Sequence, residues 1–149
     1  MEFEFEIPGV QELNHALKLL PEDIAKKVVR QAVAAGARVI RDAAKELAPY
    51  DPSRTAGVHL RDGIVVKRKK NTNDIMIIGT QTRGSKAVPY AHLLEFGTVK
   101  MSARPFLAPA AAMMQQKAIG KMFNNLSNGI LRESKKLAGV KPKKRKPKR

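Results

Sequence analysis

The sequence predicts a single α+β domain, in which a small antiparallel β-sheet packs against one long N-terminal helix and a C-terminal helix. Two long segments, residues 22–48 and about 105–137, carry apolar side chains at the three- and four-residue steps of an amphipathic helix. Between them, residues 63–69 and 75–79 are short β-rich runs separated by five polar residues, which indicates a hairpin. A chain of 149 residues has room for one core. We expect the domain to span residues 1–139 and residues 140–149 to form a basic C-terminal extension.

The first twenty residues predict a strand followed by a short helix. In residues 2–7, glutamates alternate with Phe3, Phe5 and Ile7, which is the period-two pattern of a strand, and Pro8-Gly9 ends it. Residues 10–20 then place leucines at helical spacing, and Pro21 ends this helix and suits the first turn of the next.

The helix predicted over residues 22–48 has one apolar stripe and ends before Pro49. Its alanines and Gly36 would let another backbone approach closely. The stripe comprises Ile24, Val28, Ala32, Val39, Ala43 and Leu47.

After the hairpin, residues 80–87 predict a polar, mobile loop, and residues 90–96 a helical turn that stops at Gly97. The final helix begins near Pro105 and Pro109 and ends at about Leu137. Gly120 and Gly129 should weaken it by about 1 kcal/mol each relative to alanine. Its predicted buried face consists of Ile119, Phe123, Leu126, Ile130 and Leu137.

Charge is the unusual property of this chain, whose formal net charge is +16. Such an excess predicts contact with DNA or with an acidic protein surface, although a solvated face and a solubilising end are the plainer alternatives. The candidate contacts are Lys27, Arg30, Arg38 and Arg41 on one helix face, and Lys141, Lys143, Lys144, Arg145, Lys146, Lys148 and Arg149 at the C-terminal end.

Nothing in the sequence favours catalysis, a metal or a cofactor. Residues 79–86 approach a phosphate-binding loop, but Ser85 and Lys86 are transposed relative to its pattern. His92 and Glu95 could supply two metal ligands from one helical face, yet a di-metal site needs a second such pair. The absence of cysteine excludes disulfides, thiolate zinc sites and cysteine nucleophiles. We therefore predict that the protein is not an enzyme.

A sequence motif lies across residues 88–110. It comprises Tyr90-Ala91, then Glu95-Phe96-Gly97-Thr98, then Ala103-Arg104-Pro105-Phe106 and Pro109-Ala110. This order and spacing resemble the small neck or tail-component proteins of siphophages, which are also described as head–tail joining or tail-completion proteins. The resemblance is specific over residues 88–110 and extends over residues 10–138.

The resemblance implies a structural virion protein, made in the cytoplasm of the bacterial host, that acts without catalysis or cofactor. It implies a ring, commonly of six subunits, at the head–tail interface. The implied partners are other copies of the chain, neighbouring head–tail connector and tail terminator or tail-tube proteins, and the genomic DNA in the channel, with no membrane.

The residue types in the motif also predict how this part of the chain folds. Gly97 can adopt a positive φ and turn the chain, while Pro105 presets φ where the last helix begins. We expect Phe96 and Phe106 to anchor the turn and the helix in the same core. A buried Glu95 needs a partner, for which Arg104 is the candidate. The whole motif, from Tyr90 through Glu95, Thr98 and Arg104 to Phe106, is predicted to specify the fold or an interface.

A closed ring needs two different surfaces that fit each other, and the predicted Phe3/Phe5 strand and the loop at residues 80–87 are candidates. The alternative function is a stand-alone nucleic-acid-binding protein that uses the basic helix face and the basic extension. That alternative lacks a recognition motif, and the low aromatic content disfavours stacking on single strands.

Overall fold

The computed structural model describes residues 9–50, 52–53, 57–70 and 75–139. The strand predicted over residues 2–7 and the basic extension at 140–149 lie outside these residues. The elements in chain order are α1 (Val10–Lys18), α2 (Glu22–Leu47), α3 (Leu60–Gly63), β1 (Ile64–Arg68), β2 (Met76–Thr80), α4 (Ala91–Phe96) and α5 (Leu107–Leu137). The predicted helices and hairpin are confirmed to within two or three residues at each end.

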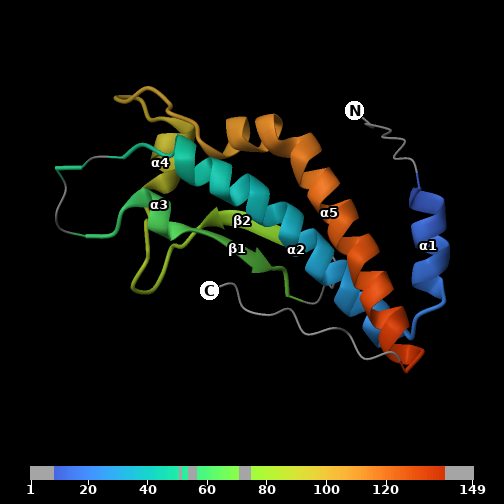
Figure 1. Ribbon diagram of the computed structural model, residues 1–149. Coiled ribbons are helices and arrows are strands. Elements are labelled where there is room, and N and C mark those ends of the chain that lie inside the picture. Colours follow the sequence, from blue (N-terminus) through green and yellow to red (C-terminus); the bar gives the residue numbers. More distant parts are fainter. Residues whose placement is uncertain (1–8, 51, 54–56, 71–74, 140–149) are drawn as a thin grey trace, which may run out of the picture.

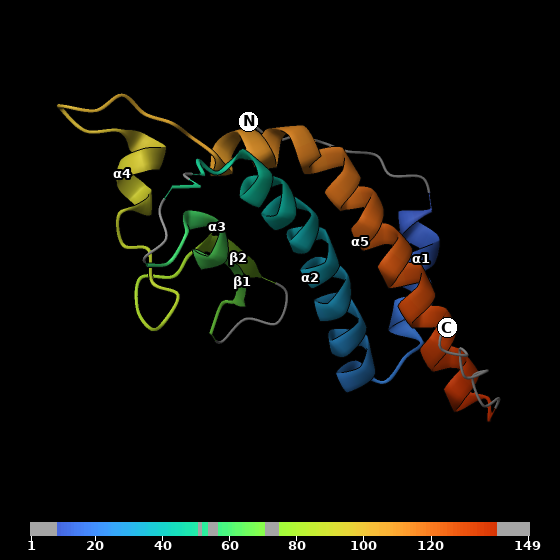
Figure 2. The same ribbon diagram turned by 60° about the vertical axis from the view of Figure 1, so that its left-hand side comes forward.

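The fold has three main layers, with α2 in the middle, the β-hairpin on one side of it and α5 on the other (Figures 1 and 2). Helix α5 runs antiparallel to α2 along most of its length, and α1 packs on the outer side of α5 (Figure 2). The two strands pair antiparallel, with Val66 opposite Ile78. The α+β class is therefore confirmed.

Small residues allow α2 and α5 to approach closely, as predicted for Gly36. A Cβ at Gly36 would lie 3.0 Å from the carbonyl oxygen of Ala118 on α5. A Cβ at Gly129 would lie 2.6 Å from Cγ1 of Val28 on α2. Gly129 therefore does more than weaken the helix, because its missing side chain admits Val28. Gly120 has no atom within 4 Å of such a position, so only the predicted cost in helix propensity applies there.

The core is divided between the two ends of the helix pair. At one end, Phe106, Ile64 and Val88 are almost fully buried among the alanines of α2, and at the other Leu20, Val28 and Ile130 pack together. The predicted stripes were wrong at their last residues, because Leu47 and Leu137, each the last residue of its helix, are exposed. Ile119, Phe123 and Leu126 are only half-buried.

The hairpin packs on α2 by one face only. Side chains alternate along a strand, so Ile64 and Val66 on β1 share a face with Ile78 on β2. Ile64 is buried against Ala43 and Ala44 of α2. The other face carries Val65, Lys67 and Ile77, and Ile77 is half exposed.

Candidate functional site

The carboxylate of Glu95, in the last turn of α4, caps the start of α5. It accepts hydrogen bonds from the backbone N–H groups of Phe106 at 2.8 Å, Leu107 at 3.0 Å and Ala108 at 3.0 Å. These are among the N–H groups that have no partner inside a helix, and a negative charge at a helix N-terminus is favourable. Glu95 is only 8% exposed. Its buried carboxylate is therefore hydrogen-bonded by three backbone N–H groups in place of water.

The predicted partner of Glu95 was wrong. Arg104 lies at the exposed surface, and its link to α4 is made by its backbone N–H, which donates to the carbonyl of Leu94 at 2.7 Å. Backbone donors satisfy a buried carboxylate without the cost of burying a guanidinium as well. Glu95 is partnered, as expected, but by the helix start.

Two opposed effects set the pKa of the Glu95 carboxyl. Burial raises its pKa, because the charged form loses water, and the three backbone N–H donors lower it. Together the donors prevail, and the pKa of Glu95 lies below its ordinary value. The charged form is therefore the one that fits this site.

Between Glu95 and the start of α5, the chain forms a loop that projects from the body of the molecule (Figure 2). Gly97 begins it with φ of 74°, as predicted. Thr98 and Met101 then exchange two backbone hydrogen bonds, of 2.8 and 3.2 Å, around a two-residue tip. We call residues 97–105 the projecting loop. Its base is held by Glu95, Gly97 and the Arg104–Leu94 hydrogen bond.

The projecting loop and its base expose apolar side chains. Phe96 is 81% exposed and Val99, at the tip, is fully exposed. The prediction that Phe96 and Phe106 anchor the same core is confirmed for Phe106, which is completely buried, and wrong for Phe96. Phe96 is the last residue of α4, where the buried face is already occupied by Ala91 and Glu95. Large exposed apolar side chains on a fixed loop are typical of a protein-binding surface.

The remaining motif residues hold this region together or lie at its surface. The half-buried Tyr90 donates from its hydroxyl to the carbonyl of Val58, at 3.4 Å. The hydroxyl of Thr98 accepts from the backbone N–H of Lys100 at 3.3 Å. Pro105 is exposed and directly precedes Phe106, which is the N-cap residue of α5.

An open, mostly apolar groove of about 510 Å³ lies beside the base of the projecting loop. Its walls come from β2, α4, the first turns of α5 and the middle of α2. The lining residues are Ile40, Ile78, Gly79, Thr80, Ala91, His92, Glu95, Phe96, Phe106, Leu107, Ala108 and Ala111.

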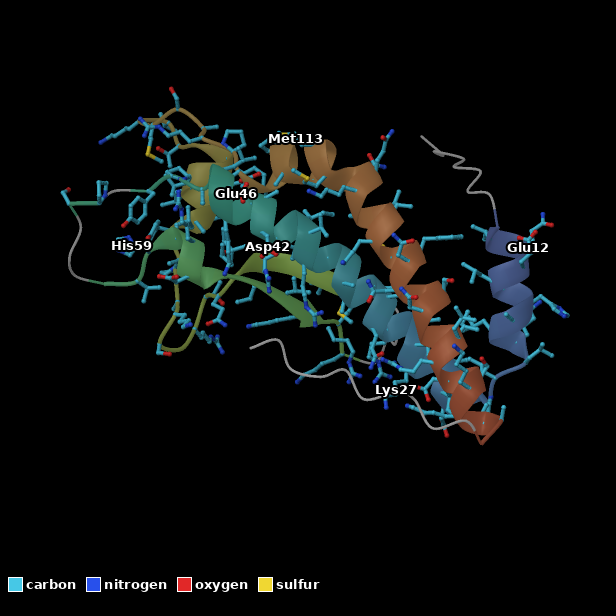
Figure 3. All side chains as sticks on the ribbon, viewed as in Figure 1. Glu12, Lys27, Asp42, Glu46, His59 and Met113 are labelled. Atoms are coloured by element: carbon cyan, nitrogen blue, oxygen red, sulfur yellow. The ribbon has the colours of Figure 1, made fainter. Side chains whose placement is uncertain are left out.

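The four basic residues predicted on α2 lie along its face away from the core. Lys27 and Arg38 are exposed, while Arg30 and Arg41 are half-buried. Figure 3 places Lys27 near the start of this helix and Asp42 near its end. Arg41 donates to the carboxylate of Asp42 through two nitrogens, at 2.6 and 2.8 Å. Of these four residues, Lys27 and Arg38 therefore offer the more accessible charges.

The residues that the sequence offered as metal ligands or as a phosphate-binding loop make other contacts in the structure. The ring of His92 contacts the carbonyl of Pro89 at 2.7 Å, while Glu95 is committed to α5. Residues 81–88 form a loop closed by a 2.7 Å hydrogen bond from Val88 N–H to the Gln81 carbonyl. In the described part of the chain, no three acidic or histidine side chains converge as metal ligands would. Nor is any helix there long and apolar enough to span a membrane.

The capping role of Glu95 follows no conventional capping motif in the sequence. A conventional capping box places the acid three residues after the N-cap, whereas Glu95 precedes the N-cap residue Phe106 by eleven positions. The only hint was the closeness of Glu95 to a proline-marked helix start.

Comparison with known proteins identifies the family. Residues 11–97 match the family described as "Bacteriophage HK97-gp10, putative tail-component". The match runs from α1 through the hairpin to Gly97 and covers more than half of the chain. The chain matches no curated protein and no solved structure.

Proposed function

This chain belongs to the HK97-gp10-like family of bacteriophage tail components, and from that premise we propose that its subunits form a ring at the joint between the DNA-filled head and the tail. The family match over residues 11–97 carries the proposal. As a structural tail component, the chain acts in the virion through contacts with other virion proteins. The ring, its six subunits, and its neighbours among the connector, tail terminator or tail-tube proteins are what we add.

The projecting loop supports an assembly role. Phe96 and Val99 expose apolar surface to water, which favours burial against another protein. Glu95 and Gly97 fix the base of the loop, so little conformational entropy is lost when it binds. A rigid apolar projection on one side of a subunit is suited to the contact between unlike surfaces that closes a ring.

The basic face of α2 supports a position near DNA. Lys27 and Arg38 are exposed on a helix whose other faces pack on the hairpin and α5. In a ring that surrounds the exit channel, such a face could line the lumen or meet an acidic neighbouring ring. The same observation favours the second candidate, a stand-alone nucleic-acid-binding protein.

The ring proposal is tested in a phage that encodes the chain. Deleting the gene should leave DNA-filled heads and tails unjoined in electron micrographs, and the wild-type gene should restore whole particles. The double variant F96S/V99S should restore at least tenfold fewer particles, because it removes two apolar side chains worth about 1.5–3 kcal/mol each when buried. Leu131→Ser is the matched control, since Leu131 is also exposed but lies far along α5. Infectious particles that lack the protein would overturn the proposal.

The second candidate predicts a different result. If the basic extension is a duplex-binding site, neutralising seven phosphates gives a slope of about −6 in a log–log plot of affinity against salt. Deleting residues 140–149 should then abolish DNA retention at low salt. If the ring proposal holds, the truncated chain should still join heads to tails.

A further inference from the structure

The outer edge of β2 is an unpaired strand edge. In the hairpin, Lys69 N–H donates to Ile75 and Gln81 N–H donates to Gly63, so the odd-numbered residues form the hydrogen-bonded pairs. The backbone N–H and C=O groups of Met76, Ile78 and Thr80 therefore point away from β1. Among the described residues the sheet has two strands only, so no third strand covers these groups.

The groove adjoins this edge and not that of β1. Ile78, Gly79 and Thr80 of β2 line it, and no residue of β1 does. Its floor comes from Ile40 of α2 and its far wall from the start of α5, including Leu107. A strand added along β2 would therefore place every second side chain in the groove, on the same side of the sheet as Ile78.

We propose that residues 2–7 of a second copy of this chain add to β2 as a third strand, with Phe3, Phe5 and Ile7 in the groove. We call residues 2–7 the N-terminal arm. The proposal rests on the proposed ring, because it names one of the two unlike surfaces that meet between neighbouring subunits. Backbone hydrogen bonds along the edge would supply part of the affinity, and the apolar side chains would set the register.

Charge favours the same occupant. The arm holds Glu2, Glu4 and Glu6, three of the thirteen acidic residues of the chain, and no cation, whereas residues 9–139 contain 22 lysines and arginines against 10 acidic residues. With the three apolar side chains in the groove, alternation places the glutamates on the outer face of the sheet. That face carries Lys67, and neither β1 nor β2 contains an acidic residue.

The position of α1 favours a second copy over the arm of the same chain. Helix α1, which begins at Val10 just after the arm, packs on the side of α5 away from the hairpin (Figures 1 and 2). The helix pair α2–α5 thus separates it from β2. The arm of a neighbouring subunit does not have to pass around this helix pair. If each subunit places its arm on the next one, the repeated contact is the head-to-tail contact of a ring.

Thiol crosslinking tests the proposal, because the chain has no cysteine of its own. Glu4→Cys and Ile77→Cys are made in separate chains of different mass, co-assembled into rings, and joined with a short bis-maleimide that tolerates one step of strand register. Both positions belong to the outer face, so neither substitution enters the groove. We expect a crosslinked pair that contains one chain of each kind. Lys135→Cys, exposed at the far end of α5, replaces Ile77→Cys as the matched control and should give none.

The contribution of the apolar side chains is measured in the same assay. Phe5→Ser should lower the crosslinking yield about tenfold, since serine removes the apolar surface that the phenylalanine side chain would bury in the groove. Glu6→Gln should leave the yield within about twofold, as expected for a charge at the rim of an interface.

The outcomes separate this proposal from the one on which it rests. If rings form but Glu4→Cys crosslinks no better to Ile77→Cys than to Lys135→Cys, the arm does not lie on β2 and the ring proposal stands. If the double variant E4C/I77C crosslinks only within one chain, the arm occupies its own groove and the exchange between copies is wrong. If no ring forms on any particle, both proposals fail.

Discussion

Glu95 and Phe106, eleven residues apart, are joined by a 2.8 Å hydrogen bond from the backbone N–H of Phe106 to the Glu95 carboxylate. The contact fixes where α5 begins, and it closes the chain segment that contains the projecting loop. One side chain therefore links the start of a 31-residue helix to the base of the loop that carries an exposed apolar tip.

Removing the Glu95 carboxylate should destabilise the fold. Glu95→Ala leaves three backbone N–H groups without their acceptor, and each unsatisfied buried donor costs about 1–3 kcal/mol. Because water can reach two of them in part, we expect the free energy of unfolding to fall by about 2–4 kcal/mol. Glu95→Gln keeps one acceptor oxygen and should lose about half as much. Urea unfolding measures both, and equal losses would contradict the capping role.

The stability contributed by Glu95 should depend on pH. Its pKa is lower in the folded protein than in the unfolded chain, so its contribution is fully present above about pH 4.3 and is lost as the pH falls through the folded value. The difference in unfolding free energy between wild type and Glu95→Gln should therefore be larger at pH 7 than at pH 3. A difference that does not change with pH would show that the charge is unimportant.

Glycine at position 97 should be required for two separable reasons. Its φ is 74°, and a Cβ there would lie 2.8 Å from the backbone nitrogen of Ala103. Gly97→Ala should cost about 1–3 kcal/mol for the backbone conformation, and more for the steric overlap. Gly84→Ala is the matched control, since Gly84 has a φ of 94° with nothing within 4 Å. If thermal unfolding shows equal losses, the overlap contributes nothing.

The Arg104 side chain should contribute little to stability. Arg104 is exposed, and its backbone N–H, which an alanine also has, makes the bond to Leu94. Arg104→Ala should change the free energy of unfolding by no more than about 0.5 kcal/mol. If Arg104→Ala lowers the free energy of unfolding as much as Glu95→Ala does, the ion pair predicted from the sequence is present after all.

The two interior glycines of α5 should respond to alanine in opposite directions. Gly129→Ala brings a methyl group within 2.6 Å of the stiff side chain of Val28 and should destabilise the protein by about 1–3 kcal/mol. Gly120→Ala meets nothing and should stabilise it by about 0.5–1 kcal/mol, the gain in helix propensity. Melting temperatures of the two variants decide this, and a gain at both positions would contradict the close packing on Val28.

The sequence predicted the elements well because two of its signals are local. These are the periodic spacing of apolar side chains and the proline and glycine residues that end helices and strands. The ends of α2, the two strands and the turn before Gly97 all follow from neighbours within a few residues. What it missed depends on contacts between distant segments. The partner of Glu95 was sought among side chains, although the start of a helix supplies donors without any side chain. Phe96 was placed inside because phenylalanine is usually buried, but the core beside α4 is already filled by Phe106.

The sheet has consequences for local stability. A hairpin of two five-residue strands, packed by one face on a single helix, is marginal by itself, whereas α2 and α5 bury each other along most of their lengths. In a monomer, amide hydrogen exchange should therefore be faster at Val65 and Gly79 than at Ala32 and Ala118, because the hairpin can open while the helix pair stays folded.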